Sequence, residues 1–176
     1  MSLSPLERRA EKIRLLLLDV DGVLTDNRLF YGDNGIEYKA FHTRDGHGMV
    51  LLQQAGLDIG IITGRTSEVV TRRMADLKVK YVYQGVPDKL PTFEALMKEC
   101  GLTPEQVAYM GDDILDLPIL RRVGLAAMPA NGDPTLRHHV HFVSQHPGGQ
   151  GAVRELCELI LKAQGRWEEI MAFYLR

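Results

Sequence analysis

A run of four leucines that ends in two aspartates constrains this chain more than any other segment. Leu15 to Leu18 offer no polar side chain to solvent, so the run predicts a strand buried on both faces, which is typical of a parallel sheet. Asp19 and Asp21 follow directly. Two carboxylates this close repel each other unless positive charge lies between them, and Mg²⁺ is commonly held by one or two carboxylates. A surface turn is the alternative, but a turn needs no apolar strand before it.

Composition narrows the classes of protein that fit. The chain has 176 residues, 45% of them hydrophobic, and a formal net charge of −2. Without a basic field, nucleic acid is not expected as a partner. Two cysteines suggest no disulfide framework, and no apolar run has the length of a membrane span. We therefore expect one soluble, cytoplasmic domain over residues 1–176, without membrane contact.

Apolar segments alternate with amphipathic ones along the chain. Asn34-Gly35 between two alternating segments predicts a β-hairpin at about residues 28–41. Strands joined by crossover helices predict an α/β fold with a doubly wound parallel sheet. The expected strands cover residues 13–18, 57–62, 81–83, 106–110, 125–128 and 140–143, and the main expected helices cover residues 5–12, 45–55, 67–77, 88–99, 114–123, 152–163 and 166–175.

Polar residues close three of these strands. Asp19 and Asp21 end the first, Thr63 ends the second, and Asp112 and Asp113 follow a later one. Ligands of open parallel sheets bind beyond the carboxyl ends of the strands, so these groups are expected at one edge. Four carboxylates there favour Mg²⁺, since it prefers oxygen ligands. Lys89, at the start of a predicted helix, is the candidate cation for a phosphate; a solvated surface lysine is the alternative.

Four segments resemble the motifs of the haloacid dehalogenase superfamily of aspartate-nucleophile phosphatases. They occur in the family's order, and the resemblance covers roughly residues 13–130. The matching segments are Asp19-Val20-Asp21-Gly22-Val23-Leu24-Thr25, Ile61-Ile62-Thr63-Gly64-Arg65, Lys89, and Gly111-Asp112-Asp113-Ile114-Leu115-Asp116.

The resemblance implies a role for each matching residue. Asp19 would be the nucleophile, and Asp21 would protonate the leaving alcohol and then activate water. The segment Thr63-Gly64 and Lys89 would hold the phosphoryl oxygens. Asp19, the Asp21 carbonyl and Asp112 would bind Mg²⁺. Supporting roles fall to Asp113, in the outer shell of the metal, and Asp116, which would orient Lys89.

Spacing leaves no room for a cap domain. Only a hairpin and one helix fit between Asp21 and Thr63, and a helix and a strand fit between Thr63 and Lys89. A neighbouring subunit is the simplest cover for so open a site. Residues 31–32, 41–48 and 148–155 resemble the branch of 3-deoxy-D-manno-octulosonate 8-phosphate phosphatases. That branch implies a homotetramer assembled by its hairpins, a sugar-acid phosphate substrate in lipopolysaccharide synthesis, and a tail, here about residues 165–176, that can cover a neighbour's site.

Several further side chains allow either a functional or a structural interpretation. Arg65, Arg73 and Arg44 are candidates to clamp a substrate carboxylate, whereas Arg72 is expected to be a surface residue. His47 fits substrate contact or helix packing equally. The run from His138 to His141 is not expected to bind metal, because strand alternation places only two imidazoles on one face.

Two other functions stay open. One is a phosphatase for a nine-carbon, sialic-acid-like 9-phosphate, which would share the same core. The other is a non-catalytic domain, which would not need the complete set of acids.

Overall fold

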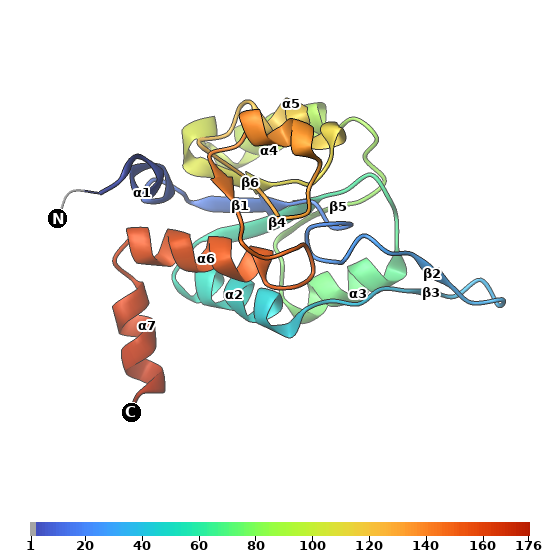
Figure 1. The fold of residues 1–176 in the computed structure, drawn as a ribbon, viewed down its shortest axis with the longest axis horizontal. Coiled ribbons are helices and arrows are strands. Elements are labelled where there is room, and N and C mark those ends of the chain that lie inside the picture. The colour runs from blue at the N-terminus through green and yellow to red at the C-terminus, as the bar shows by residue number, and fades with distance from the viewer. Residues whose placement is uncertain (1–2) are drawn as a thin grey trace.

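A parallel sheet forms the centre of the molecule. The computed structural model describes residues 3–176, and within them the sheet has six strands in the order β5-β4-β1-β6-β7-β8, every neighbouring pair parallel (Figure 1). This confirms the predicted doubly wound α/β fold. The strands are β1 (Leu15–Leu18), β4 (Asp58–Ile62), β5 (Tyr81–Tyr83), β6 (Val107–Met110), β7 (Leu125–Met128) and β8 (Phe142–Val143).

Helices cover both faces of this sheet. Strand β1 shows why: Leu16 and Leu18 pack into one buried cluster, while Leu15 and Leu17 pack into the other. Alternating side chains of a central strand point to opposite faces, so the leucine run needs apolar cover on both sides. One face packs against α1 (Pro5–Ala10), α2 (Thr43–Gln54), α3 (Glu68–Asp76) and α6 (Ala152–Ala163), and the other against α4 (Lys89–Cys100) and α5 (Leu117–Leu120).

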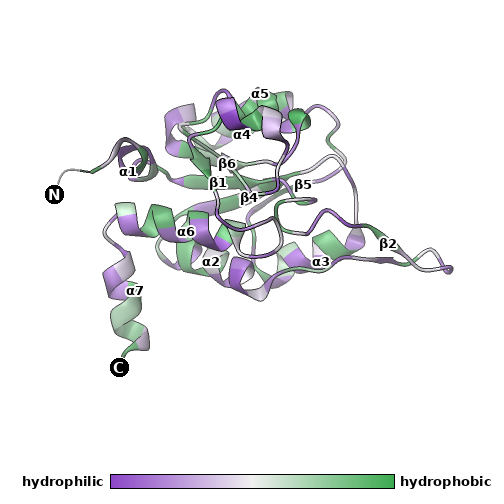
Figure 2. Cartoon of the chain, viewed as in Figure 1, coloured by the Kyte–Doolittle hydropathy of each residue, from purple (hydrophilic) through white to green (hydrophobic). Residues whose placement is uncertain are grey.

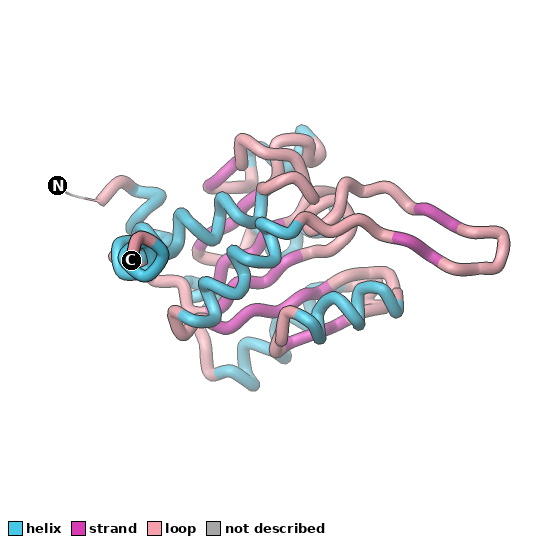
Figure 3. The backbone as a smooth tube through the Cα atoms, turned by 90° about the horizontal axis from the view of Figure 1, so that it is seen from below, coloured by secondary structure: helices cyan, strands magenta, loops and turns pink. Residues whose placement is uncertain are grey.

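A two-stranded hairpin projects from one end of the molecule (Figure 3). It consists of β2 (Phe30–Tyr31) and β3 (Glu37–Tyr38), antiparallel and outside the main sheet. Its regular part is shorter than the predicted 28–41 hairpin. Between β1 and β4 the described chain adds only this hairpin and α2, and between β4 and Lys89 only α3 and β5. The predicted absence of a cap domain is confirmed.

One predicted helix is divided in the structure. The segment expected as one helix over residues 114–123 is a 3₁₀ turn, Ile114–Asp116, followed by α5. Pro118 lies at the start of α5, where a missing N–H costs nothing, so it favours a fresh helix start there. At the end of the chain, α7 (Trp167–Tyr174) stands away from the sheet and carries polar and apolar residues together (Figure 2).

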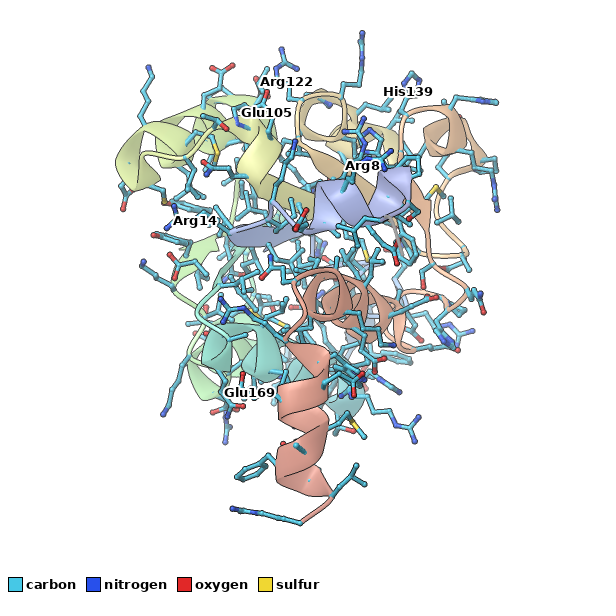
Figure 4. All side chains as sticks on the ribbon, turned by 90° about the vertical axis from the view of Figure 1, so that its left-hand side faces the viewer. Arg8, Arg14, Glu105, Arg122, His139 and Glu169 are labelled. Atoms are coloured by element: carbon cyan, nitrogen blue, oxygen red, sulfur yellow. The ribbon has the colours of Figure 1, made fainter. Side chains whose placement is uncertain are left out.

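The carboxyl ends of the strands meet at the end of the molecule that bears the hairpin. The register pairs Leu18 with Ile61 on one side and with Met110 on the other, so the residues that follow these three strands lie together. Between β1 and β6 the strand order reverses, which is where open sheets bind ligands. The opposite end instead displays exposed charged and polar side chains, among them Arg8, Arg14, Glu105 and Arg122 (Figure 4).

Over residues 3–176, no helix combines the length and the apolar character that a membrane crossing requires.

Candidate active site

A small cavity opens where β1, β4 and β6 end. Its volume is about 160 Å³. The predicted site residues line it except Asp116 and the clamp candidates Arg73 and Arg44, which confirms that the strand ends converge. The lining residues are Asp19, Asp21, Asn27, Thr63, Gly64, Arg65, Lys89, Asp112, Asp113 and Leu115.

Lys89 lies at the bottom of this cavity between two carboxylates. Its Nζ is 2.9 Å from Asp19 Oδ2 and 2.7 Å from Asp116 Oδ1. Burial alone lowers the pKa of Lys89, but the charges of Asp116 and Asp19 outweigh it and raise that pKa above its ordinary value. The alternative reading of Lys89 as a solvated surface residue is therefore wrong, since the side chain is only 4% exposed.

Asp116 is fully buried and accepts four hydrogen bonds. Lys89 Nζ donates to its Oδ1 at 2.7 Å, and the Tyr109 hydroxyl donates to the same oxygen at 2.6 Å. The backbone amides of Asp112 and Asp113 donate to Oδ2 at 2.9 and 3.2 Å. With both oxygens engaged, Asp116 is suited to orient Lys89. Tyr109 was not among the predicted site residues, because its position in an apolar strand gives no sign of a polar partner.

Three carboxylates form a cluster that fits a divalent cation. One oxygen each of Asp19, Asp112 and Asp116 lies within 4.8 Å of the others. Burial and then the charge of Asp19 raise the pKa of Asp112 to about 8, and burial raises the pKa of Asp19 to about 6 although Lys89 opposes it. One lysine cannot balance three buried acids. Asp116 accepts four bonds, whereas Asp19 has two partners, the Val20 amide and Lys89, and Asp112 accepts from Asn27, so Asp19 and Asp112 keep more lone pairs for a metal.

Glycines let the loop after β1 approach its neighbours. Gly22 has φ +88°, and a Cβ there would overlap the Asp112 carboxylate. On the other side of this loop, a Cβ at Gly148 would overlap the Gly22 carbonyl, and the Gly149 amide donates to the Val23 carbonyl at 2.9 Å. The glycine-rich turn before α6 therefore supports the loop that carries Asp21.

The base of the hairpin reaches the cavity. The Lys39 ammonium donates to Asp21 Oδ1, and its side chain is fully buried. Arg65 Nη2 donates to Glu37 Oε1 and to the Tyr31 hydroxyl, both at 2.8 Å. None of these three hairpin residues was predicted as part of the site. The available signal was the alternation of residues 36–39, which separates Glu37 and Lys39 from their apolar neighbours.

The remaining predicted side chains lie elsewhere. The Arg73 guanidinium is 5.8 Å from the centre of the Phe41 ring and lies close to Gly46, outside the lining of the active cavity, so its role in the clamp stays a prediction. Arg44 and His47 line a separate cavity beside α6. Asp113 lines the active cavity, but its Oδ1 accepts the Ile114 amide at 2.6 Å.

Arg72 is exposed on α3, as predicted. Of the histidine run, His141 accepts the Ala126 amide through Nδ1 at 2.9 Å. That imidazole has a structural partner in the backbone.

Known proteins are similar to this chain in sequence and in fold. Residues 82–156 match the haloacid dehalogenase-like hydrolase model. The chain is 45% identical over 161 residues to the 3-deoxy-D-manno-octulosonate 8-phosphate phosphatase KdsC of Escherichia coli, covering 92% of this chain and 86% of that protein.

Solved structures extend the similarity to the whole fold. The 3-deoxy-D-manno-octulosonate 8-phosphate phosphatase of Yersinia pestis is 43% identical with a TM-score of 0.92, over 94% of this chain and 89% of that one. The enzyme of the same name from Moraxella catarrhalis, in complex with magnesium, phosphate and KDO, is 39% identical with a TM-score of 0.95, over 98% of this chain and 99% of that one.

Proposed function

We propose, since this chain belongs to the 3-deoxy-D-manno-octulosonate 8-phosphate phosphatase family of haloacid dehalogenase-like hydrolases, that it hydrolyses 3-deoxy-D-manno-octulosonate 8-phosphate. The products are the free sugar acid and inorganic phosphate, a step toward lipopolysaccharide. The observation that carries the proposal is the pairing of Asp19 with Lys89 at 2.9 Å, beside Asp112, in a chain 45% identical to such an enzyme.

The reaction proceeds in two displacements. In the first, an Asp19 oxygen attacks phosphorus, the bond from phosphorus to the sugar oxygen breaks, and Asp21 gives its proton to the leaving alkoxide. In the second, Asp21 takes a proton from water, the water oxygen attacks phosphorus, and the bond from phosphorus to Asp19 breaks. Inorganic phosphate leaves, and both aspartates return to their starting states.

The other residues of the cavity would bind the substrate and the metal and balance their charges. Lys89 and the Thr63-Gly64 segment hold phosphoryl oxygens. We assign Arg65, which lines the cavity, to the substrate carboxylate. Mg²⁺ would be held by the Asp19 and Asp112 carboxylates and the Asp21 backbone carbonyl, and would neutralise charge that develops on the phosphoryl group. Asp113 supports this set from outside.

A homotetramer in the cytoplasm would complete the site. The hairpin exposes several large apolar side chains, more than an isolated loop usually leaves in water. Their burial between subunits would account for them and would bring a neighbour over the open cavity. The exposed set comprises Leu29, Phe30, Tyr31, Ile36 and Tyr38.

A phosphate-release assay tests the function. We expect Mg²⁺-dependent release from 3-deoxy-D-manno-octulosonate 8-phosphate, at a higher kcat/KM than from nine-carbon keto-acid 9-phosphates or unrelated sugar phosphates. Asp19→Asn should abolish it. Equal rates across the panel, a preference for the nine-carbon acid, or full activity of Asp19→Asn would each contradict the proposal. If light scattering gives the mass of a monomer, the proposed homotetramer is wrong.

A further inference from the structure

Lys39 is a lysine buried inside a surface hairpin. Its side chain is fully buried, whereas its neighbour Tyr38 is 57% exposed. Lysine is rarely buried without a paired charge, because removing the ammonium from water is costly. Its ammonium has two acidic neighbours, Asp21, to which it donates directly, and Glu37 at 3.5 Å. Its placement therefore requires an explanation that involves Asp21.

Both oxygens of Asp21 face cations that the hairpin holds in place. Oδ1 accepts from Lys39, and Oδ2 lies 3.6 Å from Arg65 Nε. Arg65 is itself fixed through Nη2, which donates to Glu37 and to Tyr31 at 2.8 Å each. A carboxylate on the loop after β1 is thus oriented by a segment that belongs to neither β1 nor the main sheet.

We propose that Lys39 is a positioning residue for Asp21, which fixes the carboxylate in the rotamer from which it passes protons and so makes the hairpin part of the catalytic apparatus. The proposal rests on the proposed function, in which Asp21 is the acid and the base. An ammonium suits this role because it donates to Oδ1 from a single point, so that Oδ2, which lies 3.6 Å from Arg65 Nε, can transfer the proton.

Loss of the contact between Lys39 and Asp21 should slow the reaction to a different extent for substrates with different leaving groups. A sugar alkoxide needs a proton as it departs, whereas p-nitrophenolate departs without one. Water attack on the phosphorylated enzyme needs the base with either substrate. For Lys39→Met we expect kcat on an alkyl phosphate to fall by about 10²-fold, at the low end of what a positioned acid or base contributes, with KM nearly unchanged.

The experiment uses rapid-quench and steady-state kinetics on the full chain with Mg²⁺. In Lys39→Met, p-nitrophenyl phosphate should give a burst of nitrophenolate at the wild-type rate, followed by a slow steady state. Lys39→Arg should restore most of the activity, since it keeps a cationic donor. Lys80→Met is the matched control, because Lys80 pairs with Asp58 at 2.7 Å on an exposed surface.

Other results would overturn the proposal. A rise in KM for the sugar acid with an unchanged kcat would make Lys39 a substrate ligand. A burst slowed as much as the steady state would indicate a general structural role. If Lys39→Met does not fold, Lys39→Gln, which is polar but neutral and shorter than lysine, carries the same kinetic test. The nitrophenyl arm needs no sugar substrate, so it separates failure of this proposal from failure of the proposed function.

Discussion

Replacing Asp116 by Asn tests the network beneath the cavity. The side chain keeps its shape, but one of its two acceptor oxygens becomes an NH₂ donor. The remaining oxygen can then serve either the Lys89 and Tyr109 pair or the two backbone amides of Asp112 and Asp113. In either case two buried donors lose their acceptor.

The structure sets the size of the effect. Two unsatisfied buried donors at about 1–3 kcal/mol each give a loss of roughly 2–6 kcal/mol in the free energy of unfolding. For a domain of this length that corresponds to a drop in Tm of roughly 10 °C. The substitution also removes a repulsion, which offsets part of this loss of stability. The charge of Asp116 repels the carboxylates of Asp112 and Asp19 and contributes to raising their pKa values. Mg²⁺ would already relieve that repulsion, so the loss should be larger with Mg²⁺ than with a chelator.

The assay is thermal and urea unfolding, each with Mg²⁺ and with EDTA. Asp113→Asn is the matched control, since it makes the same change in charge at an exposed neighbour and retains a side-chain acceptor for the Ile114 amide. We expect its Tm to stay within about 2 °C of the wild type, as for surface substitutions in general. If Asp116→Asn matched this control in Mg²⁺, the account of Asp116 as a fully used acceptor would be refuted.

Three further outcomes are expected. Raised pKa values of Asp112 (about 8) and Asp19 (about 6) mean that the metal-free fold favours their protonated forms, so its stability should fall as pH rises from 6 to 9. Mg²⁺ should therefore raise Tm more at pH 9 than at pH 6 in a thermal-shift titration, and an equal rise would contradict this. Gly22→Ala should lower Mg²⁺-dependent activity at least tenfold and stability by about 1–3 kcal/mol, because the added methyl overlaps Asp112 and φ is positive; wild-type kinetics would show that the loop can yield. Tyr38→Ser should shift a tetramer toward smaller species in light scattering, whereas Lys80→Met, a change at an exposed site away from the hairpin, should not.

Periodicity predicted the sheet well because each signal was local. Leu15 to Leu18 specify a strand buried on both faces, and a parallel sheet is the architecture that buries such a strand. The polar residues after β1, β4 and β6 then had to meet at one edge, and Asp19, Thr63 and Asp112 do. The segment after Asp112 was harder, since Pro118 suits either a helix start or a helix break.

Side chains that reach the cavity from distant segments could not be predicted in the same way. Lys39 reaches Asp21 only because the hairpin folds back beside the loop after β1. Neither the spacing of residues nor their alternation predicts that the hairpin packs there. The place of Arg73 beside Phe41 and Gly46, outside the lining of the cavity, depends in the same way on how α3 packs. Both positions depend on how elements dock, which single-residue patterns do not encode.

The contact of Gly148 and Gly149 with the loop after β1 has a consequence for synthesis of the protein. Asp19 and Asp21 are made early, but the turn that supports their loop is translated more than 120 residues later. Strand β6, which brings Asp112, also follows by nearly 90 residues. On the ribosome, the acids therefore emerge long before their surroundings exist, because the turn that supports their loop lies in the last quarter of the chain.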